Sequence, residues 1–170
     1  MNCRTSKVDT KRGFSLIELL IAVSIILVLT TAAVASYNTF HDRQRLREAG
    51  LTLKANLRSA QNRAQSGEKP TAGCTTLDGY KVTFTAVNYT IQADCIGFGF
   101  GSPPAMIITL PSGITFSPVP SDLVFKILGQ GASLSAPVTL SLILTGFSTT
   151  YQISVSPSGD INDLGFYTGS

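Results

Sequence analysis

The N-terminal part of the chain carries a long apolar run followed by a one-sided helical pattern. Residues 14–35 contain a single charged residue, Glu18. A helix over these 22 residues is about 33 Å long, enough to cross the hydrocarbon core of a bilayer. Small or apolar residues then recur every three or four positions, at Leu46, Gly50, Leu53, Leu57, Ala60 and Ala64. The pattern predicts one helix to about Gln65 whose second half is amphipathic, with Gly67 as its C-cap and Pro70 preventing continuation.

After Thr71 the pattern changes from helical spacing to alternation. Residues 80–84 and 89–94 alternate apolar with polar side chains around a turn at Val87-Asn88, which predicts a hairpin. Glycine and proline separate further predicted strands at residues 105–110, 114–116, 122–128, 138–145 and 150–156. We therefore expect an α+β fold in which the amphipathic half of a long N-terminal helix packs on an antiparallel β-sheet head.

Charge divides the chain into regions of different sign. The net charge of +3 comes from the first thirteen residues, where four basic residues face Asp9. Residues 42–69 hold seven basic and three acidic residues, whereas residues 70–170 hold two lysines, Lys81 and Lys126, against five aspartates. Nucleic-acid binding requires an accessible basic patch, so an acidic head argues against a nucleic acid as partner.

The residue types needed for catalysis do not come together in the sequence. His41 is the only histidine and lies in the predicted helix, so it cannot serve a hydrolytic triad in the head. The glycine-rich stretch at residues 97–101 lacks the following helix pattern and the lysine of a phosphate-binding loop. We therefore expect no enzyme activity and no cofactor.

Cysteine usage favours an oxidising compartment. Cys3 lies in the basic N-terminal segment, and Cys74 and Cys95 flank the predicted hairpin. If the N-terminal segment is removed, one pair is left, which suits one structural disulfide; two separate buried thiols are the alternative.

Glu18 is the residue that a plain membrane anchor does not explain. A carboxylate inside an apolar helix is costly unless it is paired or reaches the membrane interface. Basic residues before the apolar run favour keeping that end in the cytoplasm. A cleaved secretory signal is an alternative, since Ala33-Val34-Ala35 resembles a cleavage site, but the apolar run is too long for one.

The segment Lys11-Arg12-Gly13-Phe14-Ser15-Leu16-Ile17-Glu18, with the apolar run after it, resembles the leader of type IV pilins and type II secretion pseudopilins. The resemblance implies that a prepilin peptidase cuts after Gly13 and methylates Phe14. It also implies that Glu18 guides docking of the subunit into a growing filament, and the new amine at Phe14 has the charge needed to neutralise it. The implied partners are prepilin peptidase, other pilins or pseudopilins in a helical filament, and the inner-membrane assembly platform.

The resemblance organises the chain into four segments. These are a cleaved leader (1–13), a transmembrane and assembly helix (14–37), an amphipathic stem (38–66) and a β-rich head (67–170). Motifs such as Leu110–Ile114 and Tyr151–Ile161 are similar to the heads of the GspH/FimT-like minor pseudopilins and minor pilins. The implied protein is a single-pass inner-membrane protein with its head in the periplasm or outside the cell, later assembled into a pseudopilus or pilus. The alternative is a pilin-type module that captures DNA or another ligand at the cell surface.

A weak calcium-binding pattern occurs near the C-terminus. Asp160, Asn162 and Asp163 cluster before Gly165, as oxygen ligands do at the start of a calcium loop. The resemblance is partial, and a solvated turn is the interpretation we favour.

Overall fold

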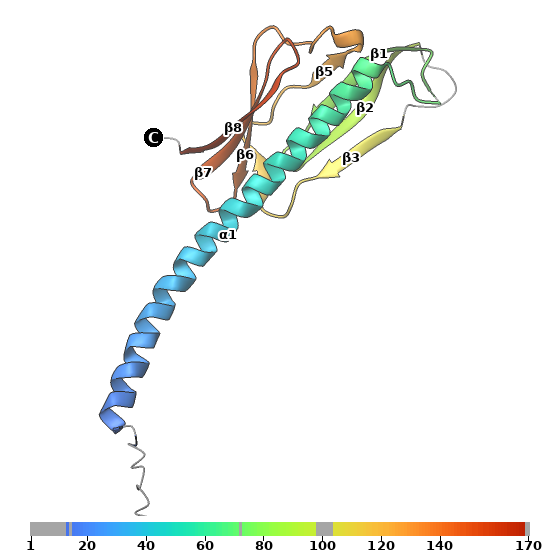
Figure 1. The fold of residues 1–170 in the computed structure, drawn as a ribbon. Coiled ribbons are helices and arrows are strands. Elements are labelled where there is room, and N and C mark those ends of the chain that lie inside the picture. The colour runs from blue at the N-terminus through green and yellow to red at the C-terminus, as the bar shows by residue number, and fades with distance from the viewer. Residues whose placement is uncertain (1–12, 14, 72, 98–103, 169–170) are drawn as a thin grey trace, which may run out of the picture. The chain divides into compact units, whose positions relative to one another are not determined.

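The computed structural model describes residues 13, 15–71, 73–97 and 104–168, with the backbone alone for residues 31–36 and 38. The chain divides into two compact units, residues 1–40 and residues 41–170. Helix α1 (Leu16–Ser66) begins in the first unit and continues into the second, and all described strands belong to the second unit (Figure 1). The leader before Gly13, and Phe14, lie outside the described residues.

The C-terminal end of α1 follows the predicted capping chemistry. Gly67 has a φ of 66°, a left-handed conformation that glycine adopts without a Cβ clash. Its N–H donates to the carbonyl of Ala64, and the N–H of Glu68 donates to the carbonyl of Arg63. These two bonds form a Schellman motif, which satisfies carbonyls that a helix end otherwise leaves without partners.

The strands form two four-stranded antiparallel sheets, not the single sheet that we predicted. The first sheet has the order β3-β2-β1-β5, with β1 (Thr76–Phe84), β2 (Asn88–Ile96), β3 (Ala105–Thr109) and β5 (Leu123–Lys126). The second has the order β4-β6-β7-β8, with β4 (Ile114–Phe116), β6 (Val138–Leu144), β7 (Thr149–Val155) and β8 (Ile161–Thr168). Alternation reports which face of a strand is buried but not which strand is its partner, so the sequence could not separate the sheets.

Two other predictions about strands were wrong. The segment that begins at Ile161, interpreted as a solvated turn, is the edge strand β8. The predicted strand over residues 122–128 ends at Lys126, because a 3₁₀ turn, η1 (Ile127–Gly129), follows with Leu128 at a φ of 54°. The apolar, strand-like residues of the sequence therefore extend beyond Lys126, where the backbone leaves the strand.

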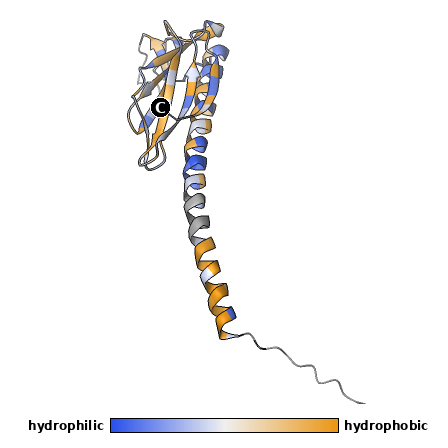
Figure 2. Cartoon of the chain, turned by 90° about the vertical axis from the view of Figure 1, so that its left-hand side faces the viewer, coloured by the Kyte–Doolittle hydropathy of each residue, from blue (hydrophilic) through white to orange (hydrophobic). Residues whose placement is uncertain are grey.

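The predicted stripe of α1 is confirmed, since all six of its residues are buried in the core of the second unit. The helix contacts both sheets. The Asn56 amide donates to the hydroxyl of Tyr89 on β2 at 2.7 Å, and the aromatic ring of Tyr151 on β7 lies directly against Gly50. Figure 2 shows hydrophobic colouring around the first turns of α1 and mixed colouring in its C-terminal half, as a one-sided stripe requires.

Three aromatic rings connect the sheets. Phe84 on β1 and Tyr89 on β2 both pack edge-to-face against Phe116 on β4, with ring centroids 5.3 and 6.3 Å apart. The N–H of Phe116 also donates to the carbonyl of Ala86 in the β1–β2 turn. The second unit is therefore one core built from the helix stripe and both sheets.

Candidate processing and assembly site

The candidate site begins at the first turn of α1. The carbonyl of Ser15 accepts the first helical hydrogen bond, from the N–H of Leu19 at 3.1 Å. Gly13 is exposed, and a Cβ placed on it would meet none of the described atoms within 4 Å. Glu18 lies in the first turn, where a carboxylate interacts favourably with the positive end of the helix dipole.

The helix surface after Ser15 is apolar on every side. Leu16, Ile17 and Val28 are 81%, 67% and 70% exposed, and the large apolar residues between them are also exposed. Successive residues point about 100° apart around a helix, so an unbroken apolar run covers the whole circumference. Such a surface is stable only in lipid or against other apolar surfaces.

The hydroxyls within this run bond to the helix itself, whereas Glu18 does not. Ser24 donates to the carbonyl of Ile21 at 2.8 Å, and Thr30 donates to the carbonyl of Ile26 at 2.9 Å. These bonds reduce the cost of placing a hydroxyl in an apolar environment. Within the described part of the chain, the Glu18 carboxylate is exposed and has no hydrogen bond or ion pair.

Among the residues that the structure describes, no helix is both long enough and apolar enough to cross a membrane.

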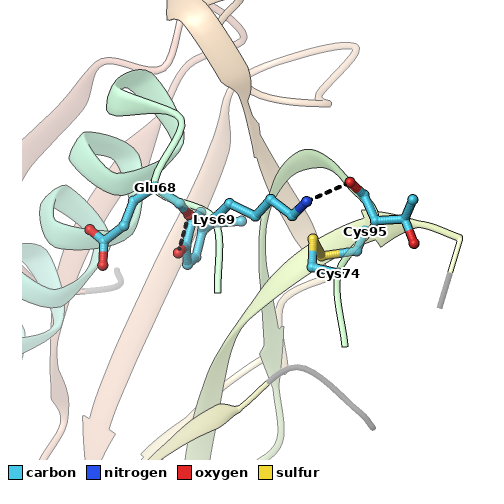
Figure 3. Close-up of a disulfide and its surroundings, with 6 residues drawn as sticks. Glu68, Lys69, Cys74 and Cys95 are labelled. Carbon is cyan, nitrogen blue, oxygen red and sulfur yellow. Dashed lines mark hydrogen bonds between the residues drawn. A yellow bond between two sulfur atoms is a disulfide. The ribbon is translucent and has the colours of Figure 1, made fainter. Parts of the chain in front are cut away.

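A disulfide and a lysine fasten the chain where it leaves α1 for the strands. Cys74 and Cys95 form a disulfide with an S–S distance of 2.05 Å. Figure 3 shows Lys69 extending over it, and the Lys69 Nζ donates to the carbonyl of Thr75 at 2.7 Å. The hydroxyl of Tyr80 donates to the carbonyl of Glu68 at 2.8 Å. The disulfide and the hydrogen bonds of Lys69 and Tyr80 therefore help to hold the described part of the connection from helix to sheet.

Of the three weak calcium candidates, Asn162 is exposed on β8, and Asp160 and Asp163 bond separately within the protein. The Asp160 carboxylate accepts a hydrogen bond from Ser158 at 2.6 Å, within the turn before β8. The Asp163 carboxylate accepts bonds from the Tyr151 hydroxyl at 2.8 Å and from the N–H of Gly165 at 3.0 Å. Over the described residues, no group of three or more histidine, cysteine or acidic side chains could hold a metal ion. The oxygens instead fasten a turn and a strand.

Sequence reasoning missed the contacts around Tyr151, which join α1 to the second sheet. Tyr151 is 3% exposed and packs edge-to-face against Phe166 at 5.2 Å. Burial, and then the hydrogen bond to Asp163, raise the pKa of Tyr151 to about 12. The Nζ of Lys54 on α1 lies 3.7 Å from the same carboxylate. Gly50 in the apolar stripe was the available signal, because a glycine inside a helix marks a place where something approaches closely.

The two lysines of the head are both engaged by carboxylates. Lys81 pairs with Asp122 at 2.9 Å, and Lys126 pairs with Asp78 at 2.6 Å. The hydrogen bond and charge of Asp122 raise the pKa of Lys81. These pairs neutralise the positive charge that a phosphate backbone would need on this surface.

Comparison with known proteins gives one match, at the N-terminus. Residues 9–34 match the prokaryotic N-terminal methylation motif, which spans Gly13, Phe14 and Glu18. This match supports a type IV pilin-like precursor that is processed by a prepilin peptidase and assembled with other pilins. Neither a curated protein sequence nor a solved structure gives a significant match to the chain.

Proposed function

We propose that this chain is a structural minor pseudopilin or minor pilin of the GspH/FimT-like type. Prepilin peptidase cuts it after Gly13 and methylates the new terminus at Phe14. The apolar first half of α1 holds the subunit in the inner membrane until it enters the filament, with the head in the periplasm or outside the cell. The motif match at residues 9–34 supports this reading, and the helix followed by antiparallel sheets is consistent with it.

The observation that carries the proposal is the environment of the Glu18 carboxylate. It is a carboxylate with no described partner in the N-terminal part of α1, whose surface is otherwise apolar. Moving such a surface into lipid or a filament core leaves an unpaired charge, which costs several kcal/mol. Cleavage after Gly13 creates an amine one helical turn from Glu18. That amine, on the same or a neighbouring subunit, neutralises the carboxylate and so favours one vertical offset between subunits.

The contacts of the head suit a structural subunit. In the second unit, α1 contacts both sheets, and the Lys54–Asp163–Tyr151 contacts fix the second sheet on the helix. Residues 41–66 of α1 and both sheets therefore move together as one unit. The subunit contributes packing surfaces, and assembly energy comes from the secretion or pilus machine.

The test replaces Glu18 and follows cleavage and assembly separately in the native host. Glu18→Ala should leave removal of residues 1–13 intact, because the cut lies before the helix, while incorporation into sheared or cross-linked filaments is lost. Glu48→Ala is the matched control, since it removes another exposed carboxylate of α1 outside the apolar run. Normal incorporation of the Glu18 variant would refute the docking role, even if processing occurs as proposed.

A further inference from the structure

The free edges of the two sheets differ in how they are protected. On β5, the N–H of Lys126 donates to Gly131 and the N–H of Ser133 donates to Val124, so a returning segment covers that edge. On β4, the N–H groups of Ile114 and Phe116 both find carbonyl partners outside the sheet. Unpaired edges invite pairing with other chains, and covering segments prevent it.

The remaining edges are β8 and β3. Strand β8 carries Asp163, and its register shifts near Leu164, so a charge and a bulge interrupt it. Both features are known protections against strand pairing. Strand β3 contains no charged residue, no proline and no register shift, and within the described part of the chain its outer side pairs with no other strand. Figure 1 shows β3 as the outermost strand of its sheet.

The register identifies which main-chain groups of β3 point outward. The N–H of Leu110 donates to the carbonyl of Val87 at 2.9 Å, which makes these two residues a hydrogen-bonded pair. Inward and outward bonding alternate along an antiparallel strand, so Ile108 bonds toward β2. The N–H and C=O groups of Ile107 and Thr109 therefore point away from the sheet, available to another strand.

A cavity of about 280 Å³ lies beside this edge, between β3 and α1. Its apolar lining includes Ala49, Tyr89 and Leu110, all buried, together with the half-buried Ile108. Arg45 and Glu48 also line it and have opposite charges, and Arg45 is oriented by a 2.9 Å hydrogen bond to the carbonyl of Ser112. The cavity is smaller than most small-molecule pockets and has no net charge at its rim.

We propose that β3 and this cavity together bind an extended, uncharged peptide segment of a partner protein. The segment pairs with the outward groups of Ile107 and Thr109 as an added strand. Residues directly opposite each other share a face of a sheet, so the residue opposite Ile108 directs its side chain toward the cavity. The main-chain hydrogen bonds provide affinity, and the cavity provides specificity for one apolar side chain. Strand-addition sites bind peptides in this way. The inference goes beyond the assembly role and depends only on contacts of the second unit.

The test measures binding of a labelled peptide to the full chain in detergent micelles by fluorescence anisotropy. The probe is fluorescein-Thr-Val-Thr-Leu-Thr-Val-Thr-amide, and the same peptide with alternate main-chain nitrogens methylated is its control. The unmodified peptide should bind saturably. The methylated peptide should bind at least about tenfold more weakly, because it cannot form the strand bonds.

Two variants, each with a matched control, test the contributions of the strand edge and of the cavity to binding separately. Ile107→Pro removes one outward N–H without taking a bond from β2, a position that an edge strand tolerates. It should weaken binding about tenfold, whereas Ile107→Val should stay within about twofold of the wild type. Thr52→Trp, at an exposed position on the cavity wall, should also weaken binding, and Ser59→Trp, exposed on the same helix away from the cavity, should not. Thermal unfolding confirms that each variant is folded.

Three results would overturn the proposal. One is the absence of saturable binding up to about 1 mM peptide, where an affinity is too weak to be specific. Another is equal binding to the wild type and to Ile107→Pro. The third is dimerisation of the wild-type chain that Ile107→Pro abolishes, because the occupant of the edge would then be a second copy. None of these results bears on cleavage after Gly13.

Discussion

Gly50→Ala places a methyl group where the ring of Tyr151 already lies. A Cβ on Gly50 would sit 2.3 Å from both Cδ1 and Cε1 of that ring, far inside ordinary van der Waals contact. The ring cannot easily move, because it is buried, its hydroxyl is bonded to Asp163, and it packs against Phe166. One element of the second unit must therefore shift.

The expected magnitude combines two opposing effects. Overpacking a core costs about 1–3 kcal/mol, whereas replacing a glycine inside a helix by alanine contributes about 1 kcal/mol of stability. The clash is with a confined ring rather than a flexible side chain, so we expect a net loss of about 1–2 kcal/mol. For a unit of this size this corresponds to a fall in melting temperature of roughly 4–8 °C.

The assay is thermal unfolding of the full chain in detergent, followed by the β-sheet circular dichroism signal. Gly50→Ala is compared with the wild type, and again in a Tyr151→Leu background, where the clash is relieved. In the Tyr151→Leu background, Gly50→Ala should leave the melting temperature unchanged or raise it. The difference between the effects of the alanine in the two backgrounds measures the coupling between position 50 and the Tyr151 ring. An alanine that raises the melting temperature with Tyr151 present would refute the close packing of helix and second sheet.

Two further predictions concern the second unit. Replacing both Cys74 and Cys95 by serine should lower the free energy of unfolding by about 3 kcal/mol, because the unfolded chain regains the entropy of a loop of that size; denaturant unfolding measures this, and an unchanged midpoint would contradict it. The pKa of Tyr151 is raised to about 12 from 10.0, so the folded state binds this proton more tightly than the unfolded state. Its stabilisation is complete below about pH 10 and is lost as the pH rises to about 12, so Tyr151→Phe should lose less stability than the wild type over that window. Equal losses in the two proteins would contradict the shift.

The sequence predicted the helix well because its signals are local. The apolar stripe of α1 and the glycine cap at Gly67 depend on spacing and on one residue type, and the structure has both. Most strands were also found, since alternation is a local property. Which sheet each strand joins depends on contacts distant in sequence, and no local pattern records them.

The missed strand β8 shows where local patterns mislead. Asp163 reads as a polar loop residue, yet its carboxylate accepts the hydrogen bond of a buried tyrosine. Gly165 reads as a turn, yet it lies within β8, next to a register shift. The oxygen-rich composition therefore offered a weak cation-site candidate, whereas the carboxylates of Asp160 and Asp163 bind groups of the protein itself. For the proposed N-terminal site, the spacing of Gly13, Phe14 and Glu18 carries the motif signal without tertiary structure.

In the proposed function, the mature chain begins at Phe14. Mass spectrometry of the N-terminus, on total membranes and on sheared surface filaments from the native host, tests this start site. We expect a peptide that begins with N-methylated Phe14. Its presence in sheared filaments would indicate a minor pilin, and its restriction to membranes would favour a secretion pseudopilin. A chain that still carries residues 1–13 in cells with active prepilin peptidase would refute cleavage after Gly13.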